Sequence, residues 1–235
     1  MKEICAVIAA GGLGTRLKNY KKNLTTKVLI EIGKSSMISS QVEQIYGWGI
    51  DNFVIITNPE FDELIKQDVR KNHPNINVEF VVQEKPLGIA HALLQTESLV
   101  KKFSKILFVL GDNFFGENPI SDLENKNFDT FLFLKKVPNP EEFGVAKIVN
   151  NQIVEIEEKP SNPSSNLAVI GIYLYDTDCF EFIKNLNFSE RGELEISDLN
   201  SELIKSNLVN YKILNSWWID AGTEERIEEL KKIIL

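Results

Sequence analysis

The chain has 235 residues, of which 43% are hydrophobic and 26% charged, and its formal net charge is −8. These proportions are typical of one globular domain and exclude low-complexity chains. No stretch approaches about eighteen consecutive apolar residues, and the first four residues do not resemble a signal peptide, so we expect no membrane span and a cytoplasmic protein. The acidic excess argues against a nucleic-acid surface built on a broad basic face.

The first predicted strand, residues 4–8, is a short apolar run that ends in a glycine-rich loop. Glycines let the backbone approach a ligand closely, bare N–H groups bind anions, and a guanidinium matches phosphate oxygens. The loop contains Gly11, Gly12, Gly14, Thr15 and Arg16. Its spacing fits neither the dinucleotide fingerprint nor the P-loop. We predict a phosphate-binding loop, although a plain strand-to-helix turn would use the same glycines.

Strands and helices alternate over the first half of the chain. Apolar, β-branched runs recur along this part of the chain, and helical patterns separate the first four strands, counted from the strand at residues 4–8. We therefore predict a parallel sheet with helices on both faces. The predicted strands are 52–57, 77–82, 105–110 and 130–134, and the predicted helices are 39–46, 60–71 and 89–102.

After residue 130 the pattern changes to strands with little helix between them. We interpret this part as an extension of the sheet around a second ligand pocket, with a hairpin turn at Asn150–Asn151. The predicted strands are 144–149, 152–156 and 168–175, and three helices follow at 177–185, 195–206 and 223–234. Cys5 and Cys179 lie far apart in apolar surroundings, which predicts buried, reduced thiols.

Two aspartates follow short apolar runs at predicted strand ends. Asp112 lies just beyond the strand 105–110, after Gly111, and Asp220 precedes the last helix. Open α/β sheets bind ligands beyond the carboxyl ends of their strands, and two carboxylates placed there could share a magnesium ion that grips substrate phosphates. The alternative is that both residues only shape turns.

Three further stretches carry groups that suit a phosphorylated ligand. Lys27 lies in a polar connection and could reach phosphate. Gln83 and Gly88 follow a strand, where an amide could read the edge of a base and a glycine would allow close approach. Glu158 and Lys159 end another strand and could bind sugar hydroxyls and a sugar phosphate. Each stretch could equally be a solvated turn or charge cluster.

In this order, the motifs closely resemble those of the sugar-phosphate nucleotidyltransferase family, and most closely the glucose-1-phosphate thymidylyltransferases. The resemblance spans nearly the whole chain. The matching segments are AAGGLGTRL, TKVL, QEKPLGIAHAL, LGDN, FGV, EEKP, NLAVIGIYLYD, SERGELEISDLN and WIDAGT.

The resemblance implies a Rossmann-like, mostly parallel sheet with an inserted β-rich sugar-binding part. It implies one domain over residues 1–235, with a nucleotide-binding half (1–130) and a sugar-phosphate-binding half (131–235). The implied reaction transfers a nucleotidyl group from dTTP to glucose 1-phosphate and releases pyrophosphate. Mg²⁺ is the implied cofactor.

The resemblance also implies roles for individual residues. Arg16 and Lys27 would hold the triphosphate, Lys159 would position the sugar phosphate, and Asp112 and Asp220 would hold magnesium. The nucleotide would contact Ala9, Gly11, Gly12, Gly14, Thr15, Gln83, Pro86 and Gly88. The sugar would contact Gly144, Glu158 and Val169.

Base choice stays open between dTTP, UTP and CTP, because His91 stands where thymidylyltransferases often have glutamine and Ala9 where leucine is usual. A non-catalytic nucleotide-sugar sensor is the alternative from another class. A pure binder would not need the metal and pyrophosphate contacts together, which favours the enzyme. We also expect the chain to form a homo-oligomer.

Overall fold

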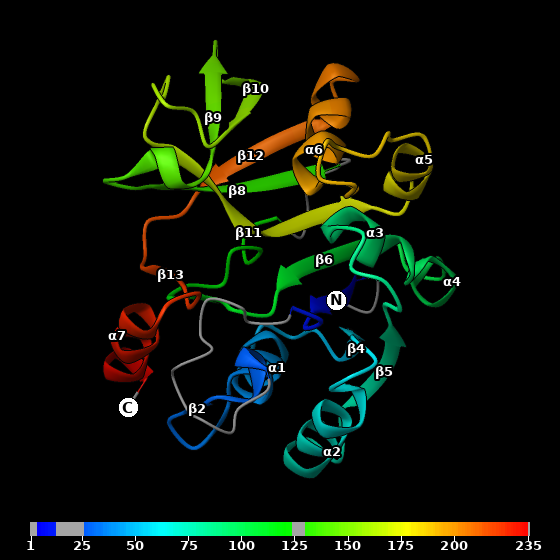
Figure 1. Ribbon diagram of the computed structural model, residues 1–235. Helices are drawn as coiled ribbons and strands as arrows, with labels where there is room; N and C mark the ends of the chain where they lie inside the picture. The colour runs from blue at the N-terminus through cyan, green and yellow to red at the C-terminus, as the bar shows by residue number, and fades with distance from the viewer. Residues whose placement is uncertain (1–3, 13–25, 124–129, 235) are drawn as a thin grey trace.

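The computed structural model describes residues 4–12, 26–123 and 130–234. Nine of the described strands form one sheet in the order β10-β9-β11-β6-β1-β4-β5, with β8 and β12 attached through β11 (Figure 1). Its first half is parallel: β1 (Ile4–Ala9) lies between β4 (Asn52–Thr57) and β6 (Lys105–Leu110), and β5 (Asn77–Val82) pairs with β4. The prediction of a mostly parallel α/β sheet is confirmed there.

The second half of the sheet is mainly antiparallel. β11 (Leu167–Asp176) runs antiparallel to β6, to β8 (Thr130–Lys136) and to β9 (Gly144–Val149). The sequence patterns did not indicate β12 (Val209–Ile213), which pairs in parallel with β8.

A hairpin joins β9 to β10 (Gln152–Glu158). Its turn residues Asn150 and Asn151 have φ angles of 50° and 60°. Asparagine tolerates this left-handed conformation, and a two-residue turn of this kind matches the twist of the strands. The predicted turn is therefore confirmed.

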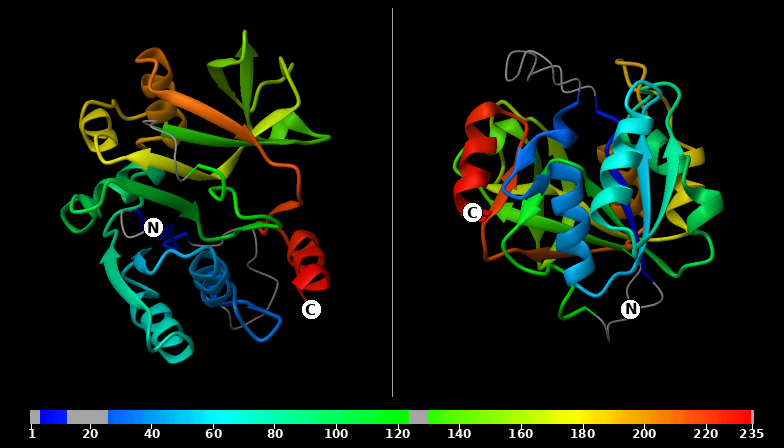
Figure 2. Two further views of the ribbon diagram at one scale, coloured as in Figure 1. Left: turned by 180° about the vertical axis from the view of Figure 1, so that it is seen from behind. Right: turned by 90° about the horizontal axis from the view of Figure 1, so that it is seen from below.

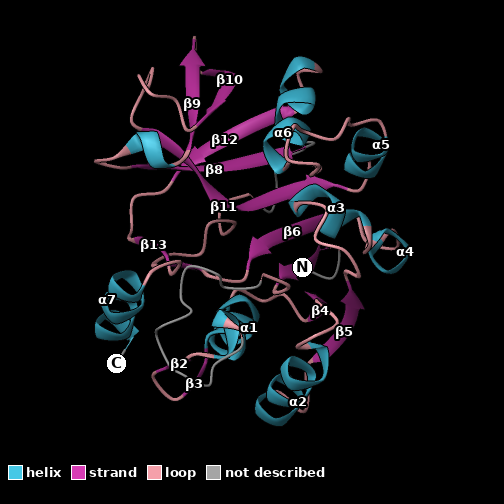
Figure 3. Cartoon of the chain, in the orientation of Figure 1, coloured by secondary structure: helices cyan, strands magenta, loops and turns pink. Residues whose placement is uncertain are grey.

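Helices cover both faces of the sheet (Figure 3). Successive side chains of a strand point to opposite faces. Accordingly, Ala6 and Ile8 of β1 pack in one core with α1 and α2, whereas Cys5 and Val7 pack in a second core with α3, α4, α5 and α6. The helices are α1 (Met37–Gly47), α2 (Asp62–Asn72), α3 (Ile89–Leu94), α4 (Glu97–Val100), α5 (Cys179–Lys184) and α6 (Ile196–Lys205). Both cysteines are buried and free, as predicted.

The single helix predicted over residues 89–102 is two short helices, α3 and α4. The Thr96 hydroxyl lies between them and donates a hydrogen bond of 2.7 Å to the Leu93 carbonyl. Threonine side chains that bond to nearby backbone compete with the regular helix ladder.

The last helix, α7 (Glu224–Ile234), packs on two small sheets instead of the large one (Figures 1 and 2). One joins β2 (Glu31–Ile32) to β3 (Ser35–Ser36), and the other joins β7 (Asn113–Phe115) to β13 (Trp218–Asp220). The buried face of α7 thereby holds β13 against β7. In the described part of the chain, no helix has both the length and the apolar character needed to cross a bilayer.

Candidate active site

A cavity of about 430 Å³ opens where the four parallel strands end. Residues at or just beyond the carboxyl ends of all four strands line it, as the general rule for ligand sites in open α/β sheets predicts. Its lining includes Ala9, Gly11, Gly12, Lys27, Gln83, Pro86, Gly88, Asp112, Asn113, Glu193 and Asp220. A larger cavity of about 810 Å³ lies between β10, α5 and α6, but none of the predicted site residues lines it.

The glycine loop enters this cavity directly after β1. The Asn58 side chain donates a hydrogen bond of 2.8 Å to the Gly11 carbonyl, which ties the loop to the end of β4. A Cβ atom at Gly11 would lie 3.2 Å from the Thr57 carbonyl oxygen, so the two segments approach closely because residue 11 is glycine. The predicted contacts of Gly14, Thr15 and Arg16 lie outside the described residues.

Lys27 and Asp112 form an ion pair across the cavity, with the Lys27 ammonium donating to Asp112 Oδ2. Only 17% of the lysine side chain and 12% of the aspartate side chain are exposed. Burial raises the pKa of the Asp112 carboxyl, but the charge of Lys27 and the hydrogen bonds from Lys27 and Asn113 outweigh it. The pKa therefore lies below its usual value, and Asp112 carries a negative charge at neutral pH.

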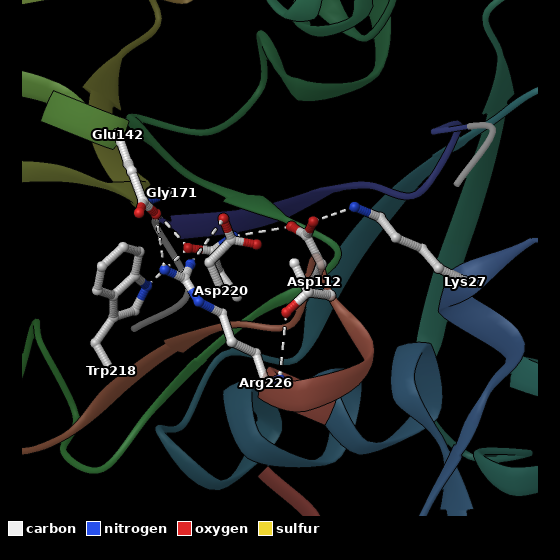
Figure 4. A network of polar contacts seen from close by, with 9 residues as sticks. Lys27, Asp112, Glu142, Gly171, Trp218, Asp220 and Arg226 are labelled. Carbon is white, nitrogen blue, oxygen red and sulfur yellow. Dashed lines mark hydrogen bonds and ion pairs between the residues drawn. The ribbon is translucent and has the colours of Figure 1, made fainter. Parts of the chain in front are cut away.

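Asn113 connects the Asp112 carboxylate to two other elements. Its Nδ2 donates to Asp112 Oδ1 at 2.9 Å, and its Oδ1 accepts from the Trp218 indole at 2.8 Å and from the Gly171 N–H at 3.2 Å. The buried Gln41 amide on α1 donates to the Asn113 carbonyl at 2.8 Å. Figure 4 shows Asp112, Gly171 and Trp218 of this network. Through Asn113, the orientation of Asp112 depends on β11 and β13.

Asp220 lies beside Asp112 through backbone pairing. It pairs with Asn113 across β7 and β13, and the next N–H, from Ala221, donates to the Asp112 carbonyl at 2.8 Å. Its Oδ2 is 3.8 Å from Arg226 Nη1. Lys27 approaches Asp112 from one side and Arg226 approaches Asp220 from the other (Figure 4). The two predicted metal ligands therefore line one cavity.

The loop predicted to read the base, residues 83–88 (here the base loop), is held against the segment before α6. Leu194 accepts a hydrogen bond from Ala90 at 3.1 Å and donates one to the Leu87 carbonyl at 2.7 Å. Gly88 has φ of 105°, and a Cβ atom there would lie 2.3 Å from the Leu194 carbonyl oxygen. Position 88 therefore requires glycine. The Gln83 amide donates to the Gly88 carbonyl at 3.0 Å.

The residues predicted to contact the sugar lie on another part of the sheet. Gly144 begins β9 opposite Glu158 at the end of β10, Val169 is half-buried in β11, and Lys159 follows β10 with φ of 45°. None of these four lines the cavity described above.

An aromatic pair connects this part to the cavity. The Lys159 N–H donates to the Phe143 carbonyl at 3.0 Å. The Phe143 ring packs edge-on against Trp218, with 5.4 Å between ring centroids. Because Trp218 also bonds to Asn113, a short chain of contacts joins the exposed end of β10 to Asp112.

Sequence reasoning gave no role to Asn113, Gln41 or Glu193. Gln41 carries a detectable signal, because it is a polar residue on the apolar face of a predicted helix, and such residues are buried only with hydrogen-bond partners. Asn113 was part of a quoted motif, but its partners lie 58 and 105 positions away in the sequence. Only the tertiary structure reveals them.

Comparison with known proteins shows which family shares this sequence and this fold. A sequence profile of the nucleotidyl transferase family matches residues 5–235. The chain is 35% identical to a glucose-1-phosphate thymidylyltransferase of Neisseria meningitidis, over 97% of this chain and 81% of the relative. It is also 34% identical to the bifunctional protein GlmU of Methanocaldococcus jannaschii, but covers only 54% of that longer protein.

Two solved structures share the fold. One is a Bacillus anthracis protein, assigned as a glucose-1-phosphate thymidylyltransferase and crystallised with sucrose, with a TM-score of 0.88 and 36% identity over 98% of this chain and 94% of that one. The other is a UDP-glucose pyrophosphorylase bound to UDP-glucose, with a TM-score of 0.83 at 21% identity, over 98% of this chain and 97% of that one. By its sequence and by the architecture around this cavity, the chain belongs to the nucleotidyl transferase family.

Proposed function

We propose that the protein transfers a nucleotidyl group from dTTP to glucose 1-phosphate and releases pyrophosphate. The observation that carries this proposal is the shared cavity. Two glycines of the loop, the Lys27 ammonium group, the carboxylates of Asp112 and Asp220 and the amide residue Gln83 all line it, although these residues are spread from position 11 to position 220. The Neisseria meningitidis relative named above supports the choice of dTTP and glucose 1-phosphate.

The donor set of the cavity fits magnesium. Among the described residues, no three His, Cys, Asp or Glu side chains gather as a metal cluster. Two carboxylates suffice for Mg²⁺, which commonly takes one or two from the protein and completes its shell with waters and substrate phosphates. Asp112 and Asp220 would hold the ion, and once bound it would neutralise charge on the phosphates.

The protein needs no general base for this reaction, because the attacking phosphate oxygen is already ionised at neutral pH. The remaining task is to bring two anions together in line. Lys27 would bind the triphosphate, and the N–H groups near Gly11 and Gly12 would add partial positive charge. Arg16 would hold the departing pyrophosphate.

The acceptor would bind at the end of β10. Glu158 would accept hydrogen bonds from sugar hydroxyls, and Lys159 would pair with the sugar phosphate. Gly144 and Val169 would line the sugar with backbone and small apolar surface. On the nucleotide side, Gln83 and Gly88 would read the base, with Ala9 and Pro86 beside them.

A direct test crosses dTTP, UTP, CTP, GTP and ATP with several sugar 1-phosphates in magnesium and measures pyrophosphate release. We expect the highest kcat/KM with dTTP and glucose 1-phosphate, and no turnover in EDTA. Higher activity with UTP or CTP would support the alternative base instead. Binding of a nucleotide sugar without any pyrophosphate release would support the non-catalytic sensor and contradict the proposed reaction.

A further inference from the structure

His91 lies in the first turn of α3 and contacts the residue expected to read the base. Gln83 Nε2 is 3.0 Å from His91 Nδ1 and also donates to the Gly88 carbonyl at 3.0 Å. An amide nitrogen carries two hydrogens and no acceptor site. Both hydrogens of Gln83 are therefore used inside the protein.

These contacts determine which end of the Gln83 amide faces a ligand. A backbone carbonyl only accepts hydrogen bonds, so Gly88 requires the amide nitrogen and not the oxygen on its side. No described residue donates a hydrogen bond to Gln83 Oε1, although the Gln83 side chain lines the cavity. The amide oxygen is the atom left for a ligand.

The contact between Gln83 Nε2 and His91 Nδ1 requires Nδ1 to accept a hydrogen bond. Only a neutral imidazole can do this, because both ring nitrogens of the charged form carry protons. Burial lowers the pKa of His91, so the ring is neutral at pH 7. On the far side of the ring, the exposed Gln95 amide lies 3.3 Å from His91 Nε2. The atom facing Nε2 is the Gln95 amide nitrogen, which is also a donor, and a neutral ring accepts at only one of its two nitrogens. The contact from Gln83 is the shorter one and the Gln95 side chain is exposed, so we assign the accepting lone pair to Nδ1 and the proton to Nε2.

We propose that His91 is a positioning residue that holds the Gln83 amide with its oxygen toward the base, so that the site selects the ring imide N–H of thymine and uracil. Cytosine has a lone pair at the same ring position. With the amide held in this way, two acceptors would face each other there, and a site built for a hydrogen bond strongly rejects a ligand that cannot make it. The inference rests on the proposed function.

Three variants test this role by comparing kcat/KM for dTTP, UTP and CTP. His91→Phe keeps a ring but removes the acceptor. His91→Asn restores an acceptor, because its Oδ1 can take nearly the place of Nδ1. Gln95→Ala removes the other contact of the ring and leaves Gln83 untouched, so it serves as the matched control.

We expect the wild type to prefer dTTP and UTP over CTP, and His91→Phe to reduce this preference at least about tenfold. The loss should come mainly from a higher KM for the imide nucleotides, with kcat nearly unchanged. His91→Asn should recover most of the preference, and Gln95→Ala should match the wild type. A general loss of folding would lower kcat for all nucleotides alike and would not change their ratio.

Three results would overturn the role of His91: wild-type preference for CTP, an unchanged preference in His91→Phe, or a His91→Asn variant no better than His91→Phe. Dissociation constants for the same nucleotides, measured by calorimetry, give the same ratios without catalysis. If the wild type binds imide nucleotides selectively but releases no pyrophosphate, the proposed reaction fails while the role of His91 stands.

Discussion

The two sides of the proposed site hold their charged groups in opposite ways. On the nucleotide side, the side chains of Lys27 and Asp112 are 17% and 12% exposed and form an ion pair. On the acceptor side, Lys159 and Glu158 are 62% and 53% exposed, and their charged atoms are 3.9 Å apart. The protein itself thus fixes the charged groups of the nucleotide side, whereas those of the acceptor side are open to solvent. Preorganised groups avoid the entropic cost of ordering on binding.

On the nucleotide side, Asp112→Asn should have the largest effect on activity of all the variants. Asparagine keeps the shape of aspartate and an oxygen for Lys27, so the protein should fold. The charge that would hold magnesium is lost, and we expect kcat/KM for pyrophosphate release to fall about a thousandfold, near the upper end for one preorganised electrostatic group. Circular dichroism would verify the fold. Turnover near the wild-type level would remove Asp112 from the mechanism.

On the acceptor side, Lys159→Ala should lower activity without changing the stability of the fold. Within the described part of the chain, the exposed Lys159 side chain has Glu158 as its ion-pair partner, and such surface pairs contribute little to folding. We expect kcat/KM for the sugar phosphate to fall about a hundredfold, with a melting temperature close to that of the wild type.

Lys147→Ala is the matched control for Lys159→Ala. Lys147 lies on the same hairpin and pairs with Glu155 at 3.3 Å, with 47% of its side chain exposed. The Lys147→Ala variant should therefore retain the kinetics of the wild type. Equal losses of kcat/KM in the two variants would show that activity depends on the total charge of the hairpin and not on the position of Lys159.

Gly88→Ala tests whether the base loop, like the ion pair between Lys27 and Asp112, is held firmly in place. The new Cβ would overlap the Leu194 backbone, and the residue would keep φ of 105°. Gly192 also has positive φ, of 74°, but a Cβ there meets nothing within 4 Å. Gly192→Ala should cost about 1 kcal/mol of unfolding free energy from strain alone.

For Gly88→Ala we expect a further cost of about 1–3 kcal/mol from overpacking, measured by urea unfolding. The KM for the nucleotide should rise about tenfold, because a shift of the loop would also move Gln83. Equal stability of the two glycine variants would mean that Leu194 moves away easily and that the loop is not rigid.

The comparison also shows which features the sequence predicts. The parallel strands β1, β4, β5 and β6 are buried on both faces, so each reads as a continuous apolar run that is easy to recognise. Asp112 could be identified because it lies just beyond such a run, and Asp220 because it ends the short apolar run of β13.

Other features depend on contacts between distant segments and leave no local pattern. β12 is half-buried at every position except the exposed Asn210, and its pairing with β8 spans 79 positions. Likewise, the bond from Gly171 to Asn113 joins residues that are 58 positions apart. Composition and periodicity describe one segment at a time, so they miss the groups that orient a catalytic side chain.

The smallest expected effect concerns Arg226, which lies between the two sides. Its guanidinium is 3.8 Å from Asp220 Oδ2 and 3.2 Å from Glu142 Oε2. A fixed positive charge beside Asp220 opposes a second cation there. With 29% of the arginine side chain exposed, screening limits this repulsion to about 1 kcal/mol.

Arg226→Gln should therefore lower the magnesium concentration for half-maximal activity about two- to fivefold, while Arg226→Lys, which keeps the charge, should change it less. Magnesium titrations of pyrophosphate release at fixed ionic strength would measure both. A higher requirement in Arg226→Gln would mean that the guanidinium orients Asp220 more than it repels the ion. In that case the metal ligands would depend on the Arg226 contact with Glu142, and the part of the site that the protein itself fixes would extend across Arg226 toward the acceptor side.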